Sequence, residues 1–178
     1  MRTSSPDLLD AIVQQAGAES SLWADCALPE DEREVVAVFS PLAEQRFRLG
    51  LETIYEAYLV HFGRPRLFAS TDRDTALLLG DYLFAHGLVR IAALGETAAV
   101  ADLAELISLC GQLRAEDRQG DGAAWAATAA LLGAGDLDEP RSVLRGGGAA
   151  AALERAARDA AGDEAVEQAL AAHAGRVG

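Results

Sequence analysis

The chain has 178 residues, enough for one domain with a sizeable apolar core. Hydrophobic residues make up 51% and aromatic residues only 6%, so the apolar content is mainly Ala, Leu and Val, and the abundance of the helix formers Ala and Leu predicts an all-α protein. The net charge of −13 repels a phosphate backbone, so we expect no nucleic-acid partner. All 15 basic residues are arginine, which excludes Schiff-base chemistry and a P-loop lysine.

Cysteine usage and the N-terminus bear on the compartment. Cys26 and Cys110 lie far apart in the sequence, which fits free thiols in a reducing cytosol better than a disulfide framework. The N-terminal stretch "MRTSSPDLLDAIVQQAG" has no apolar signal core, and no uninterrupted apolar run approaches about 18 residues. We therefore expect a soluble, cytoplasmic protein without a transmembrane segment.

The N-terminal segments contain two predicted helices. "SSPDLLDAIVQQAG" has a serine cap, Pro6 at the first helical position and Gly17 as its end. Residues 18–28 show no clear preference. The acidic segment "PEDEREVVAVF" predicts a helix over 29–39, because its carboxylates lie at the positive end of the helix dipole.

A long helix is predicted from Ser40-Pro41 to Gly63. One face is expected to be buried, because apolar side chains recur at spacings of three and four. That face consists of Phe47, Leu51, Ile54, Tyr55, Tyr58 and Leu59. Glu52 and Glu56 lie opposite the main apolar stripe, so we expect them to face solvent or a neighbouring helix.

The next predicted helix covers 72–94 and stops at Gly95. Thr71 is a plausible cap, and Asp72 and Asp74 lie where carboxylates complement the helix dipole.

This helix contains the stretch "TALLLGDYLFAHG", which is apolar almost all the way round. Glycine weakens a helix by about 1 kcal/mol, so Gly80 and Gly87 are interpreted as positions that let a neighbouring backbone approach closely. Asp81 is expected to face a polar partner or the cavity side, and a direct role for it is left open.

The C-terminal half alternates helices and glycine-rich breaks. A helix is expected over 96–117, and its predicted apolar face consists of Val100, Leu103, Ala104, Ile107 and Cys110. A short helix over 123–134 and a loop or linker over 133–148 follow, and the Ala-rich segments 149–161 and 163–174 predict loosely packed helices. The composition changes at Gly146–Gly148, which divides the chain into a helical domain (1–145) and C-terminal helices (146–178) whose docking is left open.

Residues 51–134 resemble the trans-isoprenyl diphosphate synthase (polyprenyl synthetase) family. "LETIYEAYLVH" (51–61) is similar to the family's "LELIHTASLIH", and "GRP" (63–65) resembles its Arg-Gly-x-Pro turn. "TALLLGDYLFAHGLVRIAALG" (75–95) is similar to its "AILLGDxLLAxAFELLA" helix. "ISLCGQLRAED" (107–117) and "ATAALLGAG" (127–135) resemble its Gly-Gln and "KTAALFxxA" segments. The resemblance implies a truncated isoprenoid-synthase-like antiparallel helical bundle.

The family's catalytic residues are missing from this chain. Its two DDxxD turns clamp magnesium ions that hold an allylic diphosphate, but here Phe62 runs directly into Gly63 where the first should begin. The family lysine falls on Ala127. In place of the second motif the chain has only Asp136, Asp138 and Glu139, interpreted as a solvated turn.

Metal and cofactor sites are not expected. His61, His86 and His173 are too far apart to give local ligand spacing, and no serine–histidine–acid order, Gly-rich phosphate loop or CxxC pair occurs. We therefore expect no metal, no cofactor and no enzymatic activity of the chain on its own.

The resemblance implies a non-catalytic subunit of a heteromeric trans-prenyl diphosphate synthase, which helps shape the product tunnel of a catalytic partner. The candidates for interface or tunnel wall are Tyr55, Tyr58, Tyr82, Phe84 and Leu88, each of which would otherwise be an ordinary core residue. The alternative is a stand-alone homodimeric pseudoenzyme that binds an isoprenoid or serves as a scaffold. An active minimal prenyltransferase or terpene cyclase is the third possibility.

Overall fold

The computed structural model describes residues 5–70, 72–134 and 137–177, and it is all-α, as the composition predicts. The described helices are α1 (Ser5–Glu19), α2 (Ser21–Cys26), α3 (Arg48–Phe62), α4 (Arg73–Ala92), α5 (Thr97–Ala115), α6 (Asp121–Ala130), α7 (Asp138–Arg145), α8 (Ala151–Ala161) and α9 (Asp163–Val177). Three single 3₁₀ turns, Glu30–Glu32, Ser40–Leu42 and Gln45–Phe47, lie between α2 and α3.

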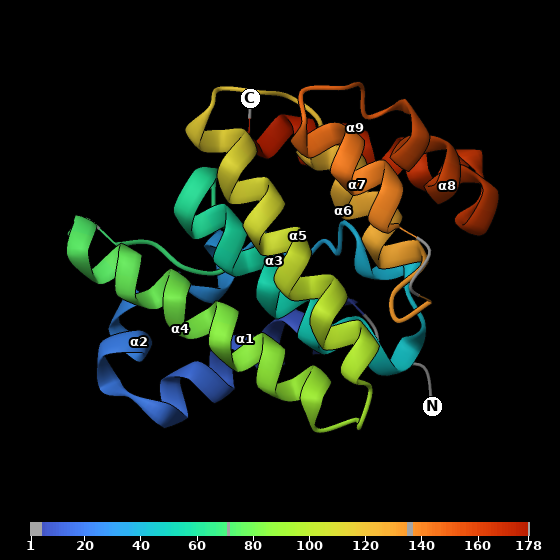
Figure 1. The fold of residues 1–178 in the computed structure, drawn as a ribbon. Coiled ribbons are helices and arrows are strands. Elements are labelled where there is room, and N and C mark those ends of the chain that lie inside the picture. The colour runs from blue at the N-terminus through green and yellow to red at the C-terminus, as the bar shows by residue number, and fades with distance from the viewer. Residues whose placement is uncertain (1–4, 71, 135–136, 178) are drawn as a thin grey trace.

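Helix α3 is the centre of the fold, and every residue from Gly50 to Leu59 is buried. Figure 1 shows α4 and α5 crossing in front of it, α1 and α2 below, and α6 to α9 at the upper right. One apolar cluster joins α3 to α5, α6, α8 and α9, and a second joins it to α1, α2 and α4. Burial on all sides means that this helix buries its polar side chains Glu52, Thr53 and Glu56 as well as its apolar face.

Helices α3 and α4 form a closely packed antiparallel pair. A Cβ added at Gly87 would lie 2.4 Å from Ile54 Cγ1 and 3.0 Å from the carbonyl oxygen of Gly50, and one added at Gly80 would lie 2.3 Å from Nε2 of His61. Gly87 therefore stands where the α3 backbone approaches closely, as interpreted, whereas Gly80 makes room for the His61 ring.

The helix predicted over 29–39 is wrong. Only Glu30–Glu32 is helical, as a single 3₁₀ turn, and residues 33–39 are not helical. The backbone of this segment is hydrogen-bonded to α3, because the N–H groups of Val38 and Ser40 donate to the Glu52 side chain. These tertiary hydrogen bonds outweigh a weak local helix preference.

Several other boundaries differ from the prediction. Helix α3 begins at Arg48 after two 3₁₀ turns, although it ends at the predicted Gly63 cap. Helix α1 continues past Gly17 to Glu19. The serine cap predicted for α1 and the Thr71 cap lie outside the described side chains. Asp72 is the N-cap of α4, where it accepts a hydrogen bond from the N–H of Thr75 (2.8 Å).

The face predicted for the 96–117 helix is partly wrong. Leu103 and Cys110 of α5 are buried, Val100 and Ile107 are half-buried, and Ala104 is exposed. The larger leucines complete the buried face instead, at Leu106, Leu109 and Leu113.

The C-terminal region is better ordered than the sequence predicts. The segment predicted as a loop or linker contains α7, whose Arg141 is buried and pairs with Asp102 at 2.7 Å. The Ala-rich helices α8 and α9 are not loosely packed, because Leu153 and Val166 are fully buried in the same cluster as α3. Residues 151–177 therefore dock on the rest of the chain.

Candidate functional site

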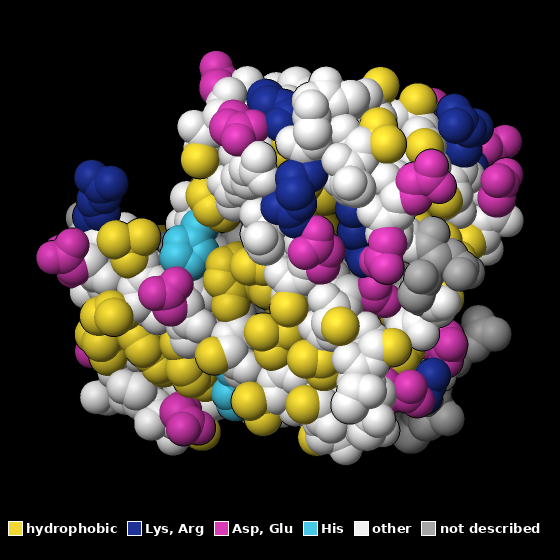
Figure 2. Space-filling view, in the orientation of Figure 1, with side chains coloured by type: hydrophobic (Ala, Val, Ile, Leu, Met, Phe, Trp, Pro, Cys, Tyr) yellow, Lys and Arg dark blue, Asp and Glu magenta, His cyan; other side chains and the backbone are white. Residues whose placement is uncertain are grey.

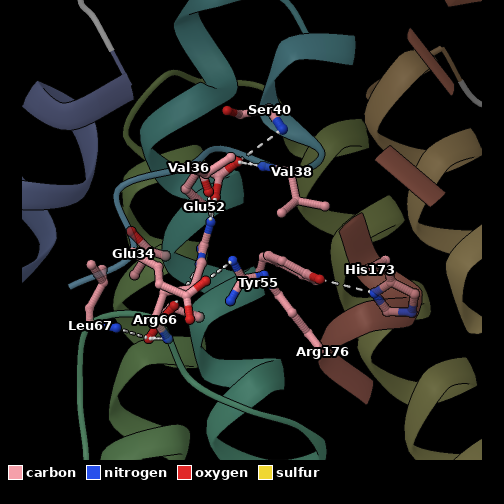
Figure 3. Close-up of polar contacts among 12 residues, drawn as sticks. Glu34, Val36, Val38, Ser40, Glu52, Tyr55, Arg66, Leu67, His173 and Arg176 are labelled. Atoms are coloured by element: carbon pink, nitrogen blue, oxygen red, sulfur yellow. Dashed lines mark hydrogen bonds and ion pairs between the residues drawn. The ribbon is translucent and has the colours of Figure 1, made fainter. Parts of the chain in front are cut away.

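The most deeply buried charges lie on α3, at the two glutamates that were expected to face solvent or a neighbouring helix. Glu52 and Glu56 are 0% exposed, and so is Arg66 from the segment after α3. The Arg66 guanidinium lies 2.7 Å from Oε2 of Glu52 and 3.0 Å from Oε2 of Glu56. Glu52 and Glu56 therefore face neither solvent nor a neighbouring helix, the two expected surroundings, because the buried Arg66 of a non-helical segment compensates their charge (Figure 3).

Backbone N–H groups occupy the second oxygen of each carboxylate. The donors are Val38 and Ser40 to Glu52 Oε1 (3.2 and 3.1 Å), and Arg66 and Leu67 to Glu56 Oε1 (both 2.8 Å). All four carboxylate oxygens therefore have protein donors. Through these hydrogen bonds, the two glutamates attach the non-helical segments around residues 38–40 and 66–67 to α3.

A second polar chain connects α3 to α5, α6 and α9. The Tyr55 hydroxyl is 3.0 Å from Nδ1 of His173, and Nε2 of His173 is 3.2 Å from Oδ2 of Asp121. Tyr58 and Arg114 donate to the same oxygen of Asp121, and Nε of Arg114 donates to the Tyr58 hydroxyl (2.8 Å). Residues that are distant in the sequence thus meet in one hydrogen-bonded unit.

The ionisation of this chain follows from burial and from its partners. Burial alone would raise the pKa of Asp121, but hydrogen bonds from His173 and Tyr58 and the charge of Arg114 lower this pKa below its usual range. Burial raises the pKa of Tyr58, and the Asp121 carboxylate raises it further. Burial likewise raises the pKa of Tyr55. Asp121 is therefore an anion that accepts hydrogen bonds from the neutral Tyr58, from Arg114 and from His173, which suits a structural role.

Tyr55 and Tyr58, two of the five interface or tunnel candidates, lie inside the molecule. Their rings pack against Trp125 with centroids 5.0 and 5.5 Å away, and both residues are at most 1% exposed. Full burial means that neither contributes to the surface.

The three candidates on α4 lie at two different places. The Tyr82 ring stacks on Trp23 of α2, with centroids 5.3 Å apart. Phe84 stacks on His61 of α3 (5.2 Å), and Leu88 is half-buried against the cluster around α3. The structure therefore does not bring the five candidates together.

An exposed apolar surface covers α4 and α5, which we call the α4–α5 face. Its large exposed side chains are Leu77, Leu78, Val89 and Leu94, with 47%, 57%, 64% and 43% of their surface accessible. Small exposed residues continue it along α5, at Ala101, Ala104 and Ser108. Figure 2 shows hydrophobic side chains gathered over this face, in a chain whose net charge is −13. An apolar patch of this kind is typical of an interaction surface.

Asp81 projects from the α4–α5 face, with 75% of its side chain exposed. Its Oδ1 lies 3.3 Å from Nε2 of His61. Asp81 thus faces solvent and a polar partner, as expected, rather than an enclosed cavity.

The other acidic groups form no metal site among the described residues, where no group of three or more His, Cys, Asp or Glu side chains is placed to hold an ion. Of the predicted acidic turn, Asp136 lies outside the described residues, while Asp138 and Glu139 begin α7. Both cysteines are free and buried.

Within the described residues, α4 alone is long and apolar enough to cross a membrane by length and composition. Of the apolar stretch that meets this criterion, 28% is buried.

Burial of the two glutamates was detectable in principle, since the stretch "LETIYEAYLV" has no other charged residue. Their partner Arg66, and the pairing of His173 with Asp121, have no local signal, because they are brought together only by the fold. No protein-family model, curated protein or solved structure matches the chain.

Proposed function

We propose that the chain is a non-catalytic helical subunit that acts by contact, with the α4–α5 face as its docking surface. The partner indicated by the sequence resemblance is a catalytic trans-prenyl diphosphate synthase chain carrying DDxxD. The subunit would supply two helices to the shared interface and thereby support the shape of the partner's product tunnel.

The observation that carries this proposal is the exposure of large apolar side chains on α4. Leu78 and Val89 lie on the same side of α4, about three turns apart, and 57% and 64% of their surface is accessible. Burying one such side chain in an interface is worth about 1.5–3 kcal/mol. The small exposed residues of α5, next to the large ones of α4, also allow a partner helix to approach closely.

The use of the acidic residues supports a non-catalytic role. Glu52 and Glu56 are spaced i, i+4 on the central helix, a spacing that could hold an ion, but Arg66 and backbone N–H groups occupy their four oxygens. Asp121 is held by Tyr58, Arg114 and His173. These carboxylates stabilise the fold.

The test is reconstitution with a purified DDxxD-containing prenyl diphosphate synthase chain. We expect a stable complex by light scattering after gel filtration, and prenyl elongation that requires both chains. Leu78→Glu should weaken the complex at least about tenfold, because it replaces an apolar contact with a charge. Leu22→Glu, at an α2 position with 44% exposure, is the matched control. The proposal is wrong if no such synthase binds, or if both variants weaken binding equally.

A second copy of the chain is the alternative occupant of the α4–α5 face, which would make the protein a stand-alone homodimer that binds an isoprenoid or serves as a scaffold. The same exposed leucines favour it. The mass measured in solution without any partner distinguishes the two. A dimer that Leu78→Glu dissociates would favour the homodimer, and a monomer would favour a separate partner.

A further inference from the structure

A groove on another part of the molecule is not used by the proposed docking role. It lies between the end of α3, the segment after it and the first turns of α4, and its volume is about 340 Å³. Its apolar walls include Leu28, Val60, Phe68, Ala76 and Leu79, and Arg64 lies at its edge. This size and lining are typical of small-molecule sites.

The wall formed by the segment after α3 is held in place before any ligand arrives. Ala27 and Phe68 form an isolated antiparallel bridge, and the Leu28 and Ala69 N–H groups donate to the carbonyl oxygens of Leu67 (2.9 Å) and Cys26 (2.8 Å). A preformed wall reduces the entropy lost on binding.

The charge at the groove is opposite to that of the whole chain. Among the described residues that line it, Arg64 alone has an ionisable side chain. Arg64 shares its carboxylate partner, because Glu34 lies 3.1 Å from Arg64 and 2.7 Å from Arg176. Two guanidinium groups on one carboxylate leave one positive charge in excess. The Arg64 side chain is also 64% exposed, so N–H donors remain available to a ligand.

We propose that this groove binds a medium-chain aliphatic carboxylate, with the tail between Val60 and Leu79 and the carboxylate on the Arg64 guanidinium. Arginine matches a carboxylate with two parallel N–H donors. Each methylene buried in the groove strengthens binding about fourfold. The α4–α5 face is also apolar, but the charge projecting from it is Asp81, which repels an anion.

Decanoate is the probe for this proposal, and the full-length chain is titrated while methyl signals are followed by NMR. We expect saturable shifts at Leu28, Val60 and Leu79. Arg64→Gln should weaken binding by about threefold to tenfold, as expected for one partly exposed charge-assisted contact. Arg73→Gln, an exposed arginine on α4 outside the groove, controls for net charge and should leave binding unchanged.

Two further measurements separate the groove from non-specific apolar binding. Ala76→Leu should fill the groove and reduce decanoate affinity at least about tenfold while thermal unfolding by circular dichroism stays cooperative. Decylammonium should bind more weakly than decanoate. Shifts at Val89 and Leu94 in place of the groove methyls, equal binding of decylammonium, equal effects of the two arginine variants, or no saturable decanoate binding would each overturn the proposal. None of these outcomes bears on whether a synthase chain binds the α4–α5 face.

Discussion

Substitutions at Glu52 test whether this carboxylate is a structural clamp. Its Oε1 accepts two backbone N–H groups, from Val38 and Ser40, and its Oε2 accepts the Arg66 guanidinium. Glu52→Gln keeps an oxygen for the backbone donors and loses the charged contact. Glu52→Leu loses both.

The structure sets the expected order of destabilisation. A hydrogen bond to a charged group contributes about 1.5–3 kcal/mol. Glu52→Gln also leaves Glu56 and Arg66 as a balanced pair, so we expect a loss near the lower limit, about 1.5 kcal/mol. Glu52→Leu also leaves the buried N–H groups of Val38 and Ser40 without an acceptor, at about 1–2 kcal/mol each. Together with the lost charged contact, the expected destabilisation is about 4 kcal/mol. Arg66→Met leaves two buried carboxylates without a cation and should cost about 3–5 kcal/mol.

Equilibrium unfolding in urea measures these differences, with the denaturant slope checked for constancy. Losses of this size are a large part of the about 5–15 kcal/mol that stabilises a domain, so the midpoints should separate clearly. The reasoning is refuted if Glu52→Leu is no more destabilising than Glu52→Gln, or if Arg66→Met costs less than about 1 kcal/mol.

Three further predictions concern packing and pH. Gly87→Ala should destabilise the protein by about 1–3 kcal/mol, because the new Cβ would lie 2.4 Å from Ile54 Cγ1. Gly111→Ala on α5 has open space around it and should stabilise the protein by up to about 1 kcal/mol. Thermal melts measure both changes. The pKa of Asp121 is lowered in the folded state, so ionised Asp121 adds to the free energy of unfolding above its unfolded pKa of about 4, and this stabilisation is lost as the pH falls. Asp121→Asn should therefore reduce the loss of stability at acid pH. Burial lowers the pKa of His61 despite its partner Asp81, so the unfolded chain binds that proton more readily and stability should fall below about pH 6.5. Burial also lowers the pKa of His86, so His61→Gln should reduce this slope and leave the part due to His86; an unchanged slope would contradict the assignment.

The parts of the fold that the sequence predicts well are those set by local signals. Helix α3 ends at the predicted Gly63, and α4 begins within one residue of the predicted start, although its cap is Asp72 and not the predicted Thr71. The prediction fails over 29–39, since its backbone partner Glu52 is more than a dozen residues away. It also fails for α7, a short helix held by the contact of Arg141 with Asp102.

Site prediction has a similar limit. The glycines of α4 were interpretable because glycine in an apolar helix has few uses other than close packing or a kink. The buried polar chain was not, because Tyr55 and His173 are far apart in sequence and neither belongs to a local motif. Apolar periodicity identified Tyr55 and Tyr58 as buried, but it could not show that their hydroxyl groups bind a histidine and an aspartate.

The distribution of polarity favours a contact role over a chemical one. Charged groups on the central helix are turned inward, where Glu52 and Glu56 are occupied by Arg66 and backbone donors, while α4 directs leucine and valine side chains outward. Burying a charge requires compensation by partners, and exposing Leu78 and Val89 forfeits the free energy of burial unless another surface covers them. A second molecule on the α4–α5 face would recover that free energy while leaving the buried carboxylates undisturbed. Docking and internal stability are therefore separable. Leu78→Glu should weaken association without destabilising the chain, and Arg66→Met should destabilise the chain without altering the exposed face.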